Sequence, residues 1–184
     1  TAVLVAAHRG KFGAQIPENS LESCEFALRL GADILEVDVC KTKDGELILF
    51  HGPKLDRVTT GKGPVSDYTF NEIKQMRFVS AIGQVTNKSV NTLDEFLERF
   101  KDRCLINLDR CWHYFDDVFD VVKRYSMTEQ ILFKSPKPAE ESLRWLSSRN
   151  LEPHFMPIVR KYSELEEWLA YSDKIRMPAV ELQA

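Results

Sequence analysis

Residues 33–39 read DILEVDV, and this stretch decides the fold class that the sequence predicts. Four of its seven positions are aliphatic, a composition typical of a strand that is buried on both faces, as in parallel sheets. After Asp33 the stretch has two further carboxylates, Glu36 and Asp38, which are two residues apart. Alternate residues of a strand point to the same face. We therefore expect a buried strand that directs two acidic side chains toward one side of a sheet.

Short apolar runs alternate with amphipathic helical stretches along the rest of the chain. Strands are predicted over residues 3–7, 33–39, 46–50, 105–108, 130–133, 154–159 and 179–182. Helices are predicted over residues 21–30, 92–100, 114–125, 139–148 and 164–170. Residues 43–45 (KDG) give a turn signal between the second and third strands, and the first strand is expected to be buried. Strands that alternate with helices predict a parallel sheet covered by helices.

Two topologies fit this alternation, a doubly wound open sheet and a (β/α)8 barrel. No glycine-rich nucleotide loop follows the first strand, which disfavours the open sheet. A barrel places its catalytic groups at the carboxyl ends of several strands, where this chain has His8, Glu36, Asp38, His51 and Asp109. Because seven strands are one fewer than a barrel needs, we expect an α/β TIM barrel truncated before its last strand. Residues 1–184 then form a single barrel domain, and the closing strand and helix lie outside this sequence.

The composition is that of a soluble globular protein, with 43% hydrophobic and 29% charged residues. A net charge of −3 argues against a nucleic-acid partner. No apolar run approaches the ~20 residues that span a bilayer, so no stable membrane insertion is expected. The four cysteines lack CxxC spacing, which argues against a zinc cluster, and we expect no structural disulfide. The sequence leaves the oligomeric state and the compartment open.

Two histidines at strand ends are candidates for acid–base chemistry. His8 lies in the motif AHRG of residues 7–10, and His51 ends the third strand. Cleavage of a phosphodiester benefits from such a pair, since one imidazole activates the nucleophile and the other protonates the leaving oxygen. The planar guanidinium of Arg9 matches two phosphate oxygens. The structural alternative is a surface HRG tripeptide and a histidine that only satisfies hydrogen bonds.

The acidic residues predict a site for one divalent cation. Glu36 and Asp38 on one buried face repel each other unless a cation lies between them. Hard ions such as Mg²⁺ and Ca²⁺ prefer carboxylate oxygens. Asp109, which follows the strand 105–108, is the expected third ligand, with Asn107 on the same side. The alternative for Asp109 is a helix cap.

A series of short motifs occurs in a fixed order along the N-terminal part of the chain. They are residues 8–10 (HRG), 17–20 (PENS), 31–33 (GAD), 36–39 (EVDV), 42–45 (TKDG), His51, residues 55–59 (LDRVT) and 91–95 (NTLDE). Together they resemble the glycerophosphodiester phosphodiesterase family in its bacterial type. Beyond Asp109 only the alternation of strands and helices agrees.

The resemblance implies a TIM barrel with one divalent ion that cleaves glycerophosphodiesters to glycerol 3-phosphate and an alcohol. It implies that His8 and His51 are the catalytic pair, that Arg9 binds the phosphate, and that Glu36 and Asp38 are metal ligands. The expected partner is therefore a small-molecule glycerophosphodiester. Bacterial members of the family are often exported, which favours an exported or periplasmic location.

The chain departs from the family pattern at three positions. Gly52 follows His51 where the family usually has aspartate, so a polar neighbour of the histidine is missing. Asp109 and Cys111 stand where the family pattern resembles Glu-x-Lys. Aspartate keeps the carboxylate with a shorter reach, whereas cysteine removes a positive charge that would face the phosphate. We expect Lys134, after the strand 130–133, to supply that charge as a phosphate-binding residue.

Two other functions stay open from the sequence. One is a phospholipase C- or D-like enzyme on intact lipid, which needs an apolar rim to dock on a membrane. The loop 59–66 is polar and disfavours it, although Trp112, with Tyr114 and Phe115, can contact a lipid or the alcohol of a ligand. The other is a non-catalytic barrel that binds phosphodiesters, which the departures motivate. Glu181, on the last predicted strand, is a further candidate for the pocket.

Overall fold

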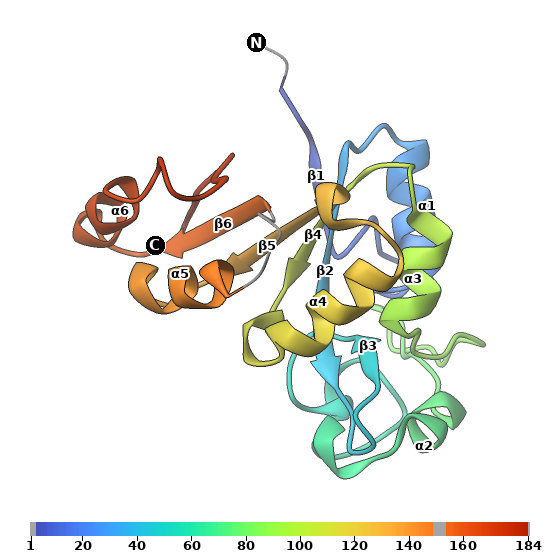
Figure 1. Ribbon diagram of the computed structural model, residues 1–184. Helices are drawn as coiled ribbons and strands as arrows, with labels where there is room; N and C mark the ends of the chain where they lie inside the picture. Colours follow the sequence, from blue (N-terminus) through green and yellow to red (C-terminus); the bar gives the residue numbers. More distant parts are fainter. Residues whose placement is uncertain (1–2, 149–153, 184) are drawn as a thin grey trace.

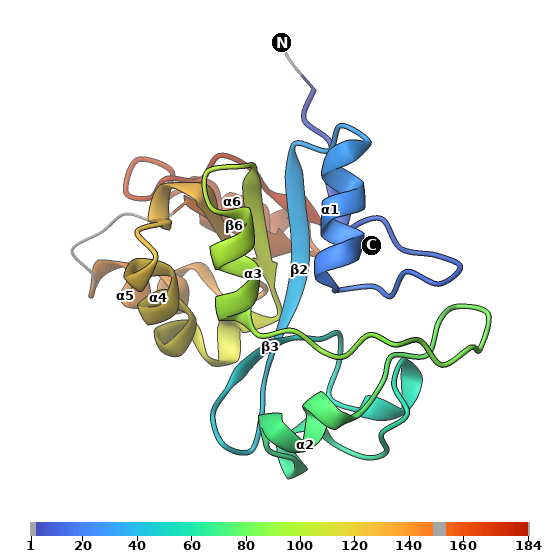
Figure 2. The ribbon, with the colours of Figure 1, turned by 90° about the vertical axis from the view of Figure 1, so that its right-hand side faces the viewer.

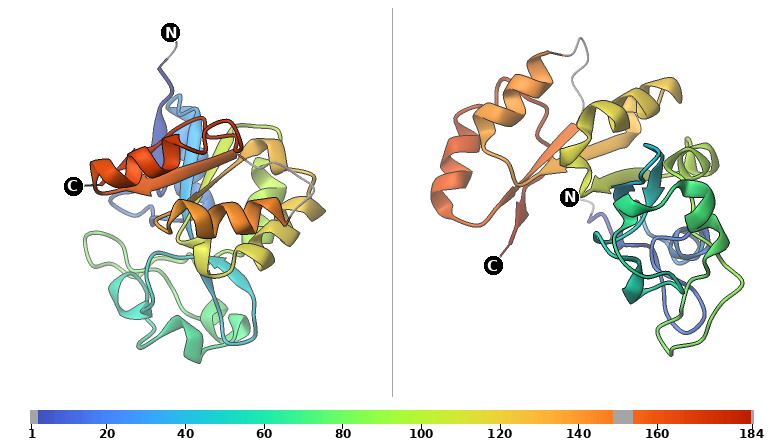
Figure 3. Two further views of the ribbon diagram at one scale, coloured as in Figure 1. Left: turned by 60° about the vertical axis from the view of Figure 1, so that its left-hand side comes forward. Right: turned by 90° about the horizontal axis from the view of Figure 1, so that it is seen from below.

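The computed structural model describes residues 3–148 and 154–183 (Figure 1). A curved sheet of parallel strands forms its centre, with the order β1-β2-β4-β5-β6-β7. The strands are β1 (Ala6–His8), β2 (Ile34–Lys41), β4 (Leu105–Asp109), β5 (Ile131–Ser135), β6 (His154–Val159) and β7 (Glu181–Leu182). The barrel class predicted from the sequence is confirmed, since these six described strands form a half-barrel, which is seen from below in Figure 3.

Helices cover the outer face of the half-barrel. They are α1 (Leu21–Arg29), α3 (Leu93–Phe100), α4 (Phe115–Arg124), α5 (Ala139–Ser147) and α6 (Tyr162–Leu169). The main core lies between helices and strands and contains Leu35, Phe96 and Phe133, all fully buried. Ser20 caps α1 and Thr92 caps α3, each through a capping box, because a side-chain oxygen there accepts from an otherwise unpaired backbone N–H.

The segment 42–91, here called the inserted segment, does not belong to the barrel wall. It contains β3 (Leu47–Leu49), the short helices η1 (Leu55–Arg57) and η2 (Val65–Asp67), and α2 (Phe70–Gln75). It lies beyond the carboxyl end of β2 (Figure 2) and packs around its own core, which includes Ile48, Leu55, Ile73 and Phe78.

The structure corrects the number of barrel strands in the prediction. The predicted strand 46–50 is present as β3, but it pairs antiparallel with β2 and is not a barrel strand. The reason is the tight turn before it, in which Gly45 has a φ of 89°. A turn of this length joins only antiparallel strands, because a parallel pair needs a long crossover.

The expected burial of the first strand is also wrong. The strand is confined to β1, and Val3, Leu4 and Val5 before it are exposed. Within the described residues β1 pairs on one side only, with β2, so it is an edge strand. Apolar composition predicts burial correctly only where neighbours cover both sides of a strand.

The cysteines are free thiols, of which Cys24, Cys40 and Cys111 are buried. Burial raises the pKa of Cys24 and of Cys40 to about 12. Among the helices in the described ranges, none combines the length and the apolar character needed to cross a bilayer.

Leu55 provides a test of the inserted segment's core. Its side chain is fully buried, so Leu55→Ala is expected to lower the free energy of unfolding by about 2–5 kcal/mol. Leu30→Ala, at an exposed position, is the matched control and is expected to change it by less than about 0.5 kcal/mol. Chemical denaturation measures the free energy of unfolding of both variants. If Leu55→Ala lowered it as little as Leu30→Ala does, the core of the inserted segment would not contribute to cooperative folding.

Candidate functional site

A cavity of about 550 Å³ lies on the inner side of the half-barrel. All six parallel strands contribute to its wall. The polar and ionisable side chains that line it include those of His8, Arg9, Glu36, His51, Asn107, Asp109, Arg110, Lys134 and Glu181. The sequence therefore predicted most of this set correctly as neighbours, although the residues come from segments far apart in the chain.

Three carboxylates form a cluster at this cavity. Oxygen atoms of Glu36, Asp38 and Asp109 all lie within 4.8 Å of one another. The cause is the register of two neighbouring strands, since β2 and β4 pair Asp38 with Asp109 and Glu36 with Asn107. Burial raises the pKa of Glu36, and the negative charge of Asp38 raises it further. Such a cluster is stable only with positive charge close to it.

The cluster fits a hard divalent cation. In the described part of the chain, the buried oxygens Glu36 Oε1 and Asn107 Oδ1 accept no hydrogen bond. Buried polar atoms without a partner are rare and call for a ligand or an ion. Three carboxylates and an amide oxygen are the donors that Mg²⁺ and Ca²⁺ prefer. Glu36, Asp38 and Asp109 are therefore placed so that they could hold such an ion.

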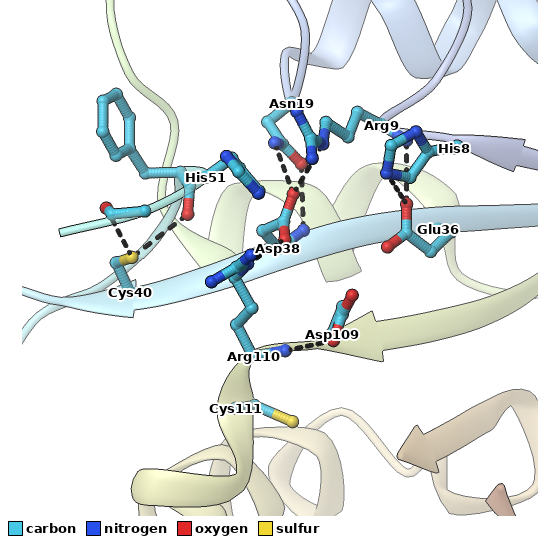
Figure 4. Close-up of polar contacts among 12 residues, drawn as sticks. His8, Arg9, Asn19, Glu36, Asp38, Cys40, His51, Asp109, Arg110 and Cys111 are labelled. Atoms are coloured by element: carbon cyan, nitrogen blue, oxygen red, sulfur yellow. Dashed lines mark hydrogen bonds and ion pairs between the residues drawn. The ribbon is translucent and has the colours of Figure 1, made fainter. Parts of the chain in front are cut away.

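Asp38 is held from several directions (Figure 4). Asn19 Nδ2 donates to Asp38 Oδ2 at 3.0 Å, and the Asp38 backbone N–H donates to Asn19 Oδ1 at 2.9 Å. Arg9 Nε lies 3.2 Å from Oδ2 and Arg110 Nε lies 3.1 Å from Oδ1. A carboxylate has about four acceptor positions, so these contacts fix its orientation and leave room for an ion.

The two histidines reach the cavity from different elements. His8 ends β1, and its Nε2 lies 4.0 Å from Glu36 Oε2. His51 follows β3, and its Nδ1 lies 3.4 Å from Arg57 Nη2. Burial lowers the pKa of His51, and the positive charges of Arg9, Arg110 and Arg57 act in the same direction, against the opposite effect of Asp38. The structure thus brings both predicted histidines to one site.

Glu18 links two arginines beside the histidines. Arg9 Nη1 lies 3.3 Å from Glu18 Oε1, and Arg57 also forms an ion pair with that carboxylate. Burial raises the pKa of Glu18, but the hydrogen bonds and charges of Arg57 and Arg9 outweigh burial and hold it below its usual value. Sequence reasoning did not single out Glu18 or Arg57, although both lie in motifs of the family resemblance.

Lys134 reaches the site, as predicted, and contacts carboxylates there. Its Nζ lies 2.8 Å from Asp109 Oδ2, 2.8 Å from Glu181 Oε2 and 3.7 Å from Glu36 Oε1. Burial acts to lower the pKa of Lys134, but these three carboxylates outweigh it and raise the pKa. The sequence proposal that Glu181 lies at the pocket agrees with this arrangement.

Trp112 lies outside the cavity, contrary to its expected place in the pocket. It lines a separate depression of about 290 Å³ together with Tyr114, Phe115 and Trp145. The reason is the short helix η3 (Cys111–His113), which begins directly after Arg110 and takes the chain away from the carboxylate cluster. The side chain of Cys111 is fully buried, and its Sγ donates to the Leu108 carbonyl at 3.4 Å.

Comparison with known proteins gives consistent results. The model of the family described as "Glycerophosphoryl diester phosphodiesterase family" matches residues 8–162. A glycerophosphodiester phosphodiesterase of Bacillus subtilis is 41% identical over 107 residues, which are 53% of this chain and 36% of that protein. A solved structure of a glycerophosphoryl diester phosphodiesterase from Parabacteroides distasonis has a TM-score of 0.81 and 27% identity, and covers 91% of this chain and 58% of that one.

A phosphodiesterase from Oleispira antarctica, solved in complex with the product sn-glycerol-3-phosphate, shares the fold. Its TM-score is 0.70 at 21% identity, and the match covers 98% of this chain and 74% of that one. This chain spans less than half the length of two curated relatives that it matches, 36% and 44%. With a family model that matches residues 8–162, the chain belongs to the glycerophosphoryl diester phosphodiesterase family.

Proposed function

We propose that this chain carries the catalytic residues of a metal-dependent phosphodiesterase that hydrolyses glycerophosphodiesters to glycerol 3-phosphate and an alcohol. The observation that carries the proposal is the convergence of His8, His51 and Arg9 with three carboxylates on one cavity. The names of the relatives and the glycerol 3-phosphate bound to the Oleispira antarctica protein support this class of substrate.

Glu36, Asp38 and Asp109 are the residues that hold the divalent cation in this proposal. Glu36 Oε1 supports their assignment, since this buried oxygen accepts no hydrogen bond from the described residues and Lys134 Nζ lies 3.7 Å from it. A bound Mg²⁺ or Ca²⁺ supplies positive charge that neutralises a phosphate oxygen. The oxygen-only donor set favours these two ions but does not distinguish between them.

Arg9 binds the phosphate in this proposal. Its backbone N–H donates to Glu36 Oε2 at 2.9 Å, and its guanidinium is held between Glu18 and Asp38. A side chain fixed in this way loses little rotamer freedom when the substrate binds, and it opposes the negative charge that develops on the phosphate oxygens. The direct contact between Lys134 and the phosphate that the sequence predicts stays a prediction. In this structure the Lys134 ammonium contacts three carboxylates.

The two histidines move the protons of the reaction. One takes a proton from the attacking hydroxyl, which belongs either to water or to the glycerol of the substrate; in the second case a cyclic phosphate forms, and water must then open it to give glycerol 3-phosphate. The other gives a proton to the alcohol oxygen as the P–O bond to the alcohol breaks. His8 and His51 are suited to the two tasks because they line the same cavity and lie at separate positions along the cluster, His8 beside Glu36 and His51 beside Asp38 (Figure 4).

Replacement of either histidine tests the proposal. His8→Ala and His51→Ala are each expected to lower kcat by about 10²–10⁴-fold. The measurement is release of glycerol 3-phosphate from a panel of glycerophosphodiesters, with intact phospholipid vesicles as a further substrate. His154→Ala is the matched control, since His154 begins β6 and pairs with Glu129 away from the cavity. Saturable binding without turnover would instead identify a non-catalytic phosphodiester-binding protein.

The metal site is tested separately from catalysis. Addition of Mg²⁺ or Ca²⁺ to chelator-treated protein is expected to raise the melting temperature, because an ion bound only to the folded state stabilises it by about 2.7 kcal/mol at 100 times its Kd. Asp109→Asn is expected to remove most of this increase. Asp120→Asn, on the exposed side of α4, is the control. A melting temperature that responds to neither ion would contradict the assignment.

A further inference from the structure

Arg110 has an unusual backbone conformation at the rim of the cavity. It directly follows β4, and its φ of 58° lies in the left-handed region. Residues other than glycine are uncommon there, and such conformations are concentrated at functional sites. The Arg110 backbone N–H donates to Asp109 Oδ1 at 2.6 Å, which ties this turn to a residue of the carboxylate cluster.

The turn directs the guanidinium of Arg110 to the cluster. Arg110 Nε lies 3.1 Å from Asp38 Oδ1, while Arg9 Nε lies 3.2 Å from Asp38 Oδ2. The two guanidiniums approach the same carboxylate from opposite sides (Figure 4). Both arginines line the cavity, so Asp38 orients two planar cations toward one space.

Arg110 is the most accessible of the cations that line this cavity. Its side chain is 43% exposed, compared with 16% for Arg9 and 5% for Lys134. Lys134 has three carboxylate partners and Arg9 has two, whereas the contact with Asp38 is the one ion pair of the Arg110 guanidinium within residues 3–148 and 154–183. Its terminal Nη groups are therefore available to an incoming anion.

The side chain of Cys111, next to Arg110, cannot bind the anion in place of Arg110. Cys111 is fully buried and contacts the Leu108 carbonyl, so it adds no polar group to the cavity. A guanidinium has five donors in a planar fork that matches the oxygens of a phosphate. Because the ion pair with Asp38 is formed at Nε, the two Nη groups of the guanidinium remain for a ligand.

We propose that Arg110 is a substrate-binding residue that, together with Arg9, holds the phosphate of the glycerophosphodiester. The inference rests on the proposed function, which it deepens by naming a second phosphate-binding cation. It adds Arg110 to the cations that contact the anion, whereas the contacts of Lys134 in this structure are with Glu36, Asp109 and Glu181.

Binding of sn-glycerol 3-phosphate and of inorganic phosphate, measured by calorimetry with Mg²⁺ present, tests the proposal without turnover. Arg110→Ala is expected to weaken binding of both anions by about 10- to 100-fold, the range of one or two lost charge-assisted hydrogen bonds. Arg110→Lys is expected to recover part of the affinity, because it restores charge without the fork. Arg124→Ala is the control, since Arg124 pairs with Asp94 on the outer surface.

A second variant separates binding from folding. Arg110→Gly suits the left-handed backbone and is expected to melt at a temperature no lower than that of Arg110→Ala while losing the same affinity. Anion affinities of the alanine and glycine variants equal to that of Arg124→Ala would overturn the proposal, as would a wild-type protein that binds neither anion. Wild-type binding that depends on Arg110 without any hydrolysis would support the proposal for Arg110 and contradict the proposed enzyme.

Discussion

The close approach of three carboxylates is the constraint around which the rest of the site is arranged. Pairing of β2 with β4 places Asp38 opposite Asp109, and Glu36 lies two residues away on the same face. Burial of this much negative charge is unfavourable unless cations compensate for it. Arg9, Arg110 and Lys134 each contact the cluster, and Glu36 Oε1, which accepts no hydrogen bond from the described residues, leaves a place for a metal ion.

The inserted segment completes the site from outside the barrel wall. Its antiparallel strand β3 extends from β2, so His51 is carried to the cavity by a hairpin and not by a crossover helix. The buried Leu55 anchors η1, which places Arg57 beside His51 and Glu18. The proposed catalysis therefore depends on two hydrophobic cores. His8 belongs to the barrel wall, which packs on the main core, and His51 belongs to the inserted segment, which packs on its own core.

Much of this arrangement could be predicted from the sequence. Apolar runs and their alternation with helices identified the strands. Because every second side chain of a strand points to the same face, Glu36 and Asp38 could be placed on one face. The antiparallel pairing of β3 was missed because a strand's composition does not reveal its direction, although the turn at Gly45 contained that information. Arg110 was missed because its contact with Asp38 depends on a left-handed turn that an arginine rarely adopts. The exposure of Val3–Val5 could not be predicted, since burial of a strand depends on its neighbours in space.

The most direct test of the account is diffraction from crystals soaked in Mn²⁺, with data collected at a wavelength that gives an anomalous signal from manganese. The account predicts one strong anomalous peak among the carboxylate oxygens of Glu36, Asp38 and Asp109, each at a coordination distance of about 2.0–2.6 Å. The absence of a peak there, or a cluster held only by Lys134 and the arginines in the presence of the ion, would contradict it.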